Sequence, residues 1–359
     1  PGTPLRDALT NHAAEQVVRL AQAGDVRLAD ILDERALVNA LVMLLATGGS
    51  TNLTIHLVAI GQAAGLQLRW EDMAALSAVV PTLAHIYPSG KADINQFHAA
   101  GGTSWLFRQL LSGGLLHEQV QTVAGFGLAR YCREPVLQDG ELQWREGAAA
   151  SLDDSILRPL EAPFLSDGGL RLLQGNLGRG VLKVSAVDQA HWQVKAPCRV
   201  FDEQDDFVVA FQAGELDRDC VAVLRFQGPR ANGMPELHKL MPYLGVLQDR
   251  GHQVALVTDG RMSGASGKVP AAIHLCPEAA IGGPLAYLRD GDLVALDAGQ
   301  GQLKVQLDEA ELQARTPALQ PQSVRRGLGR ELFAFMRGEA SPAEQGGSVF
   351  TASLQQADR

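Results

Sequence analysis

The segment 259–268, with the sequence Asp-Gly-Arg-Met-Ser-Gly-Ala-Ser-Gly-Lys, gathers the residues best suited to chemistry. It follows a β-branched run that is typical of a strand, so we expect a polar, glycine-rich loop. Two serines, Ser263 and Ser266, are flanked by the cations Arg261 and Lys268. A nearby positive charge lowers the pKa of a hydroxyl group, so a serine in this setting can act as a base or a nucleophile.

The end of this segment has a superficial likeness to the phosphate-binding loop of nucleotide-binding proteins. That motif needs a glycine five residues before its Gly-Lys pair and a hydroxyl side chain directly after the lysine. Met262 and Val269 occupy those two positions in this chain. The sequence therefore argues against a nucleotide site, while binding of a phosphate group by the loop stays open.

A second glycine-rich segment, 227–239, follows the β-branched run 220–226 and leads into an expected helix at 235–250. Loops that follow a strand and precede a helix are where layered α/β folds bind ligands. Pro235 suits the first position of a helix, and Glu236 suits the first turn, where the helix dipole favours a carboxylate. A carboxylate beside glycines is also a suitable Mg²⁺ ligand. Spacing alone favours the helix-start interpretation of Glu236.

The third such segment, 47–52, reads Thr-Gly-Gly-Ser-Thr-Asn and lies between two expected apolar helices. Glycines let the backbone approach a ligand, and the free N–H groups at a helix start favour an anion. Ser50, Thr51 and Asn52 are therefore candidate substrate-binding residues. The same residues are typical of a tight turn followed by an ordinary helix cap, and that alternative stays open.

The sequence contains no obvious metal site built from cysteine or histidine. The four cysteines lie far apart, and none is spaced as in a C-x-x-C or zinc motif; they are Cys132, Cys198, Cys220 and Cys276. We interpret them as reduced, buried thiols of a cytoplasmic protein. The nine histidines do not form a cluster either.

These segments need elements to position them, and the chain predicts an α/β protein in two parts. Helices are predicted at 5–23, 34–46, 53–64, 70–79 and 102–111, with few strands in this first part. Strands are predicted at 180–187, 198–201, 207–211, 220–226, 253–258, 292–296 and 303–307, with helices at 235–250 and 330–337. We therefore predict a mostly helical domain at 1–150 and a β-rich domain, a sandwich or a barrel, at 151–359.

Composition excludes two classes of partner. The chain has 359 residues and a net charge of -9, so it lacks the basic surface expected of a nucleic-acid-binding protein. No apolar run approaches the roughly 18 residues expected of a membrane helix. The sequence begins at Pro1 without an initiator methionine, and we expect either a removed leader or a fragment of a larger protein.

Taken in order, these segments resemble one family, the dehydratases that include dihydroxy-acid dehydratase and 6-phosphogluconate dehydratase. The family likeness lies in 45–52 (Leu-Ala-Thr-Gly-Gly-Ser-Thr-Asn), 93–102, 175–177, 258–264 (Thr-Asp-Gly-Arg-Met-Ser-Gly) and 276–279. A narrower likeness to the 6-phosphogluconate dehydratases lies in 226–241 and 263–270, with support from 123–128, 144–147 and 329–333. The resemblance extends along essentially the whole chain.

The resemblance implies a hydro-lyase of the Entner–Doudoroff route, which converts 6-phospho-D-gluconate to 2-dehydro-3-deoxy-6-phospho-D-gluconate. In such enzymes an iron–sulfur cluster acts as a Lewis acid on the departing 3-hydroxyl while a base removes the C2 proton. By position, Ser263 matches the proposed base and Glu236 matches a carboxylate that binds Mg²⁺. Some relatives carry threonine where this chain has Ala265, so we expect Ser266 to take over its hydrogen bond.

The resemblance also implies a swivelling β/β/α barrel-like C-terminal domain that follows the last part of an N-terminal α/β domain, in a cytoplasmic homodimer when full length. The family's cluster cysteines lie upstream of the matched region. A 4Fe–4S cluster is therefore expected only in the full-length enzyme, and this chain is expected to be inactive alone. For the substrate phosphate we expect Lys268 and Ser266, assisted by Arg261 or Arg230, because phosphate contacts are usually charge-assisted.

Two alternatives stay open. The chain could be another dehydratase of the family, acting on a dihydroxy acid or an unphosphorylated sugar acid. It could also be a truncated, non-catalytic chain that binds anions without turnover.

Overall fold

The computed structural model describes residues 2–262, 267–321, 327 and 329–350, and the chain divides into two compact units. The first unit comprises residues 1–48, 64–66 and 79–168, and the second comprises residues 49–63, 67–78 and 169–359. The sequence-based domains, 1–150 and 151–359, differ from these units in two respects. Residues 151–168 group with the first unit, and the segments 49–63 and 67–78 group with the second.

Side chains cap the start of several helices of the first unit. They are α1 (Pro4–Ala23), α2 (Leu28–Ile31), α3 (Glu34–Ala46), α6 (Ile94–Ala99) and α7 (Gly102–Ser112). The hydroxyl of Thr3 accepts a hydrogen bond from the N–H of Arg6 at the start of α1, and Gly24 ends that helix with a φ of 66°. The helices predicted at 5–23, 34–46 and 102–111 are confirmed.

The prediction of few strands in the first 150 residues is wrong for 121–146. Two antiparallel hairpins lie there, β1 (Gln121–Thr122) with β2 (Gly125–Phe126) and β3 (Arg133–Gln138) with β4 (Glu141–Glu146). Asp139 and Gly140 turn between β3 and β4 with φ values of 52° and 85°, as the Asp-Gly pair of a two-residue hairpin does. The strands were missed because their side chains are mostly exposed and do not alternate between apolar and polar.

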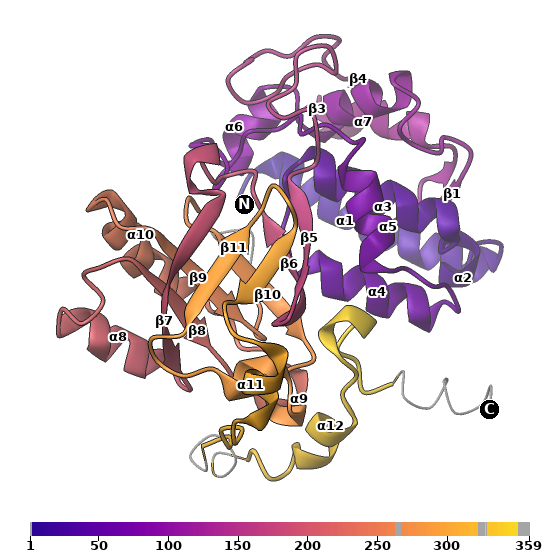
Figure 1. Ribbon diagram of the computed structural model, residues 1–359. Coiled ribbons are helices and arrows are strands. Elements are labelled where there is room, and N and C mark those ends of the chain that lie inside the picture. The colour runs from indigo at the N-terminus through magenta and orange to yellow at the C-terminus, as the bar shows by residue number, and fades with distance from the viewer. Residues whose placement is uncertain (1, 263–266, 322–326, 328, 351–359) are drawn as a thin grey trace. The chain divides into compact units, whose positions relative to one another are not determined.

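The second unit contains a closed barrel of eight strands, as the β-rich pattern predicted (Figure 1). The strands are β5 (Leu170–Gly175), β6 (Gly178–Lys183), β7 (Gln193–Phe201), β8 (Cys220–Leu224), β9 (Val254–Thr258), β10 (Ala271–Cys276), β11 (Leu293–Asp297) and β12 (Gln302–Val305). Their order around the barrel is β10-β6-β5-β12-β11-β7-β8-β9. The pairs β7–β8, β8–β9, β9–β10 and β5–β12 are parallel and the other pairs are antiparallel. The mixed α/β class is therefore confirmed.

Strands β8 and β9 carry the two loops that matter most for the site. Every residue of both strands is buried, and both read as apolar runs, Cys-Val-Ala-Val-Leu and Val-Ala-Leu-Val-Thr. Parallel strands covered on both faces have this composition, which is why both were predictable. Neither β5 nor β10 was predicted, and β10 was missed because His274 interrupts its apolar run.

Helices of the second unit correct two predictions. They are α4 (Leu53–Ala63), α5 (Trp70–Ser77), α8 (Gln204–Gln212), α9 (Pro229–Asn232), α10 (Met241–Asp249), α11 (Glu309–Ala314) and α12 (Ala334–Glu339). Residues 207–211, predicted as a strand, belong to α8, which lies with α10 on the side of the barrel formed by β7, β8 and β9 (Figure 1). Phe207 and Ala210 are buried one turn apart while Val209 is 64% exposed, so the β-branched residues of this segment concealed a helical period.

The helix predicted at 235–250 begins later than expected. Residues 241–249 form α10, and Glu236 instead pairs with Arg261 in an isolated parallel β-bridge. The prediction that Pro235 starts a helix and Glu236 occupies its first turn is therefore wrong; Pro229 starts α9 instead. The predicted helix 330–337 overlaps only partly with α12.

Short 3₁₀ turns are η1 (Leu128–Cys132), η2 (Gln189–His191), η3 (His238–Leu240), η5 (Ala279–Ile281), η6 (Pro284–Tyr287) and η8 (Ala343–Gln345). Within the described ranges, no helix has the length and apolar character needed to cross a bilayer.

Candidate functional site

The segment 259–262, which follows β9, is anchored first by the carboxylate of Asp259. This side chain is fully buried, and it accepts main-chain hydrogen bonds from Gln227 (2.8 Å), Phe226 (3.2 Å) and Ala279 (2.9 Å). Burial raises the pKa of the Asp259 carboxyl to about 6, although the three N–H groups act to lower it. One carboxylate therefore joins the loops that follow β8, β9 and β10.

The three carbonyl groups that follow Asp259 are each held by a different element. The donors are the N–H of His274 on β10 to Gly260 O (2.9 Å), the N–H of Leu237 to Arg261 O (3.3 Å) and the hydroxyl of Thr51 to Met262 O (2.6 Å). Every described residue of the segment is thus fixed by at least one hydrogen bond. These hydrogen bonds hold the segment 259–262 in place immediately before residue 263 of the sequence.

Beside the segment 259–262, the side chains of Glu236, Arg261 and Asn52 contact one another. The Asn52 amide Nδ2 donates to Glu236 Oε2 at 3.4 Å, and Arg261 Nη1 donates to the same oxygen at 3.3 Å. Arg261 is fixed further by the bond from its Nε to Met234 O (2.5 Å). Because only an amide nitrogen can donate to a carboxylate, Asn52 Oδ1 is the free end of that amide, and it is buried without a hydrogen-bond partner among the described residues.

The structure brings together four of the residues proposed for the site and leaves others apart. Thr51, Asn52, Glu236 and Arg261 form one connected group, and the Ser50 hydroxyl accepts the N–H of Asn52 at 3.3 Å. Ser263, the proposed base, and Ser266 lie outside the described residues. The ammonium of Lys268 pairs with Asp249 on α10, and Arg230 Nε donates to Ala340 O at 2.7 Å.

Lys183 is a buried cation beside the Ser50–Asn52 turn that the sequence motifs did not indicate. It is 7% exposed at the end of β6, and its Nζ donates to Gly49 O at 3.2 Å. Burial lowers the pKa of this ammonium to about 8. A lysine within the apolar run Gly-Val-Leu-Lys-Val was the signal that could have identified it.

Glu278 is a second buried carboxylate that sequence reasoning missed. Its oxygens accept the N–H groups of Arg230 (2.9 Å) and Ala231 (3.3 Å) at the start of α9. Burial raises the pKa of Glu278 to about 7, and the negative charge of Asp259 acts in the same direction. A β-carbon on Gly228 would lie 1.9 Å from Glu278 Oε2, so the glycine is needed for this close approach.

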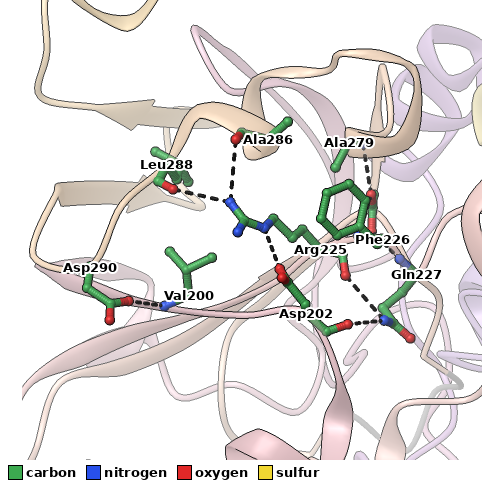
Figure 2. Close-up of polar contacts among 10 residues, drawn as sticks. Val200, Asp202, Arg225, Phe226, Gln227, Ala279, Ala286, Leu288 and Asp290 are labelled. Atoms are coloured by element: carbon green, nitrogen blue, oxygen red, sulfur yellow. Dashed lines mark hydrogen bonds and ion pairs between the residues drawn. The ribbon is translucent and has the colours of Figure 1, made fainter. Parts of the chain in front are cut away.

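The loop after β8 is also fixed by Arg225, which Figure 2 shows at the centre of a polar network. Its Nε donates to Asp202 Oδ1 at 2.6 Å, and its Nη1 donates to the carbonyl groups of Ala286 and Leu288 at 3.4 and 3.3 Å. The neighbouring Gln227 side chain donates to Asp202 O at 3.0 Å. These contacts hold the loop that carries the two N–H donors to Asp259.

The described cysteines do not suit an iron–sulfur cluster. All four are buried, and burial raises the pKa of the thiols of Cys198 and Cys276 to about 12 and that of Cys220 to about 11. Cluster ligands are thiolates, which such surroundings disfavour. Among the described residues, no group of three or more His, Cys, Asp or Glu side chains is arranged to hold a metal ion.

The oxygen atoms of Glu236 and Asn52 do fit a hard cation. The Glu236 carboxylate contacts Asn52 through the amide Nδ2, and Oδ1 of the same amide is buried without a hydrogen-bond partner among the described residues. Carboxylate and amide oxygens are the protein ligands that Mg²⁺ accepts, with waters completing its shell. Two protein ligands are typical of such a site, because Mg²⁺ keeps several of its waters. The pair therefore suits Mg²⁺ better than a transition metal.

Comparisons with known proteins agree in one family. Residues 155–347 match the family model described as dihydroxy-acid/6-phosphogluconate dehydratase C-terminal, and residues 1–131 match the corresponding N-terminal model. The chain is 66% identical over 356 residues to a phosphogluconate dehydratase of Pseudomonas aeruginosa, with 99% of this chain and 59% of that protein covered. It is 56% identical to a phosphogluconate dehydratase of Escherichia coli K12 (98% and 59% covered) and 35% identical to a dihydroxy-acid dehydratase of Ignicoccus hospitalis (93% and 58% covered). The chain thus spans about three fifths of the length of these relatives.

Proposed function

Because the chain belongs to the dihydroxy-acid/6-phosphogluconate dehydratase family, we propose that it takes part in the dehydration of 6-phospho-D-gluconate to 2-dehydro-3-deoxy-6-phospho-D-gluconate. In this reaction the substrate loses its C2 hydrogen and its C3 hydroxyl as water, and the resulting enol tautomerises to the 2-keto acid. The reaction is a step of the Entner–Doudoroff route of carbohydrate metabolism. The enzyme would be a hydro-lyase.

The observation that carries the proposal is the convergence of Thr51, Asn52, Glu236 and Arg261 on the segment that directly precedes Ser263. These residues come from three glycine-rich segments, 47–52, 227–239 and 259–268. The hydrogen bonds that join the first segment to the second and third span 184 and 211 positions of the sequence. A catalytic residue must be held in a defined position, and polar side chains from distant segments that contact a hydrogen-bonded loop provide such a setting. Phosphogluconate dehydratases are also the relatives of highest identity reported above.

We assign the proton transfer to Ser263 and the binding of substrate oxygens to the residues that contact the segment 259–262. Ser263 would remove the C2 proton, helped by the positive charge of Arg261 two residues earlier. Ser50, Thr51 and Asn52 would bind hydroxyl or carboxylate oxygens of the sugar acid. Lys268 and Ser266 remain our candidates for the phosphate, and Lys268 would have to leave Asp249 to reach it.

Two cofactors belong to the proposal with different support. Glu236 and Asn52 would hold Mg²⁺, which supplies positive charge next to the anionic substrate when bound. We retain the family expectation of a 4Fe–4S cluster, whose ligands are not among the described cysteines, and we derive no step from it. A cytoplasmic location and a homodimer complete the proposal as family expectations.

The test is a dehydration assay with the full-length enzyme, because this chain is expected to be inactive alone. The enzyme is supplied anaerobically with iron, sulfide and Mg²⁺. We expect a 2-keto-3-deoxy acid from 6-phosphogluconate and much less product from gluconate or from a dihydroxy acid. Preference for one of the other two substrates would identify a different dehydratase of the family. Absence of turnover combined with binding of 6-phosphogluconate would favour the non-catalytic alternative.

A further inference from the structure

His274 connects the two segments that form the base of the proposed site. It is fully buried on β10, at a point where the register of β10 with β6 shifts between Ile273 and Cys276. Its backbone has a φ of 61°, which is costly for a residue with a β-carbon. Such conformations persist where the surrounding structure fixes them, often beside functional sites.

The hydrogen bonds around Thr54 determine the tautomer of the His274 imidazole. His274 Nδ1 lies 3.2 Å from Thr54 Oγ1, and the Thr54 hydroxyl donates its single proton to Thr51 O at 2.8 Å. Since that proton is already used, the oxygen must accept from His274, so Nδ1 carries the hydrogen. Nε2 is then a bare lone pair, which agrees with its burial without a hydrogen-bond partner among the described residues.

We propose that His274 is a positioning residue, held as the Nδ1–H tautomer, that sets the Ser50–Asn52 turn against the loop base at 259–262. This inference rests on the proposed function of that site. Two series of hydrogen bonds start from His274. The side chain reaches Thr51 O through the Thr54 hydroxyl, and the main-chain N–H reaches Gly260 O at 2.9 Å.

Thr51 closes the connection, because its own hydroxyl donates to Met262 O at 2.6 Å. His274, Thr54, Thr51 and the loop base therefore form a ring of hydrogen bonds around the start of α4. Trp70 Nε1 donates to Thr54 O at 3.2 Å and holds the same turn from α5. A ring of this kind transmits any displacement of the imidazole to Asn52, which lies next to Thr51 and binds Glu236.

The first test needs no substitution. Long-range ¹H–¹⁵N correlation spectra of the whole chain, with ring nitrogens labelled, distinguish the two neutral tautomers of a histidine. We expect a pyrrole-type nitrogen at His274 Nδ1 and a pyridine-type nitrogen at Nε2 at pH 7. A pyridine-type signal at Nδ1, or a doubly protonated ring, would overturn the proposal.

The second test compares two amide replacements. His274→Asn places an amide nitrogen near the position of Nδ1, so it can still donate to Thr54, and asparagine tolerates a positive φ. His274→Gln places its amide near the position of Nε2 and loses the bond to Thr54. Thr54→Ser and Thr54→Val form the matching pair, since only serine keeps the hydroxyl.

The readouts are the dissociation constant for 6-phosphogluconate and amide hydrogen exchange in peptides that cover residues 50–57. We expect His274→Asn and Thr54→Ser to stay within about threefold of the unchanged protein in both. We expect His274→Gln and Thr54→Val to weaken binding and speed exchange about tenfold, which is typical for the loss of one buried hydrogen bond. Rescue by glutamine but not by asparagine would overturn the proposal, because it would assign the role to Nε2.

Equal behaviour of the asparagine and glutamine variants would also overturn it. If the unchanged protein does not bind 6-phosphogluconate, the proposed function fails, but the tautomer and the exchange pattern still decide the role of His274. If the chain binds the ligand and the exchange pattern does not separate the variants, the positioning role fails alone. Variants that do not fold leave the tautomer measurement as the deciding result.

Discussion

Replacing Asp259 by asparagine should change how the stability of the second unit depends on pH. The carboxyl is fully buried, and its pKa is raised from 3.8 to about 6 by that burial. The native state therefore binds more protons than the unfolded state between about pH 4 and pH 6. Stability that is fully present below the unfolded pKa is lost as the pH rises through the folded pKa. An asparagine side chain cannot titrate, so this loss disappears in Asp259→Asn.

The size of the effect follows from the pKa change. Moving a pKa from 3.8 to about 6 corresponds to about 3 kcal/mol, at about 1.4 kcal/mol for each pH unit. Asparagine keeps one acceptor oxygen, which can retain the bonds from Phe226 and Ala279, but its NH₂ group then faces the N–H of Gln227. A protonated carboxyl keeps a lone pair on its hydroxyl oxygen and can still accept from Gln227, so asparagine carries an additional cost that does not depend on pH. Relative to the unchanged protein, the stability of the variant should therefore rise by about 3 kcal/mol between pH 4 and pH 8.

Native-state hydrogen exchange in peptides from β8 and β9, measured between pH 4 and pH 8 and corrected for intrinsic rates, reports the stability of this unit separately. Asp30→Asn, followed in peptides of its own unit from α2 and α3, is a control of opposite sign, because the pKa of the exposed Asp30 is lowered to about 2 by hydrogen bonds from Arg27. That variant should be less stable than the unchanged protein at neutral pH and should not differ from it below pH 2. If the stability of Asp259→Asn relative to the unchanged protein does not rise between pH 4 and pH 8, the three N–H groups outweigh burial and our reasoning is wrong.

Three further substitutions test the groups around the site. In the full-length enzyme, Lys268→Ala should raise KM for 6-phosphogluconate at least tenfold more than KM for gluconate. Lys239→Ala, which removes a similarly exposed lysine paired with an aspartate, should not, and equal effects of Lys268→Ala on both substrates would contradict a phosphate contact. Glu236→Gln should weaken Mg²⁺ binding, measured by calorimetry, at least tenfold, and an unchanged affinity would remove Glu236 from the metal site. Lys183→Met should raise stability at pH 7 by up to about 3 kcal/mol, because burial lowers the pKa of the Lys183 ammonium from 10.5 to about 8. The free-energy cost of burying the charged ammonium is therefore fully present below pH 8 and absent above pH 10.5. A destabilised variant at pH 7 would show that the hydrogen bond to Gly49 outweighs this cost.

The parts of the fold that could be predicted are those in which local pattern and tertiary burial agree. Strands β8 and β9 are buried on both faces and read as apolar runs, and Gly24 marks the end of α1 by its left-handed backbone. The pattern failed at α8, where Val208 and Val209 favour a strand locally but the burial of Phe207 and Ala210 follows a helical period. It failed again at β3 and β4, because a mostly exposed hairpin has no apolar face to detect.

The candidate site was predictable as a set of segments but not as a geometry. Glycine and polar residues marked the three loops, and Thr51, Asn52, Glu236 and Arg261 do meet. Glu236 was assigned to a helix start because its β-bridge with Arg261 depends on a residue 25 positions away.

The supporting residues carry no local signal of their role. Four polar residues are important because they are buried, namely His274, Asp259, Glu278 and Lys183. Their burial arises only when the barrel folds, so no local sequence pattern predicts it. Their pKa changes likewise arise from desolvation and not from neighbours in the sequence.

The most direct test of the proposed reaction follows the hydrogen at C2 of the substrate. The full-length enzyme is supplied with iron, sulfide, Mg²⁺ and 6-phosphogluconate deuterated at C2, and release of deuterium to water is measured alongside ligand binding. We predict release by the unchanged protein, and at least a hundredfold less release by Ser263→Ala with binding preserved, as expected for the loss of a general base. Equal release by both proteins would contradict the assignment of Ser263, and binding without release by the unchanged protein would contradict the proposed dehydration.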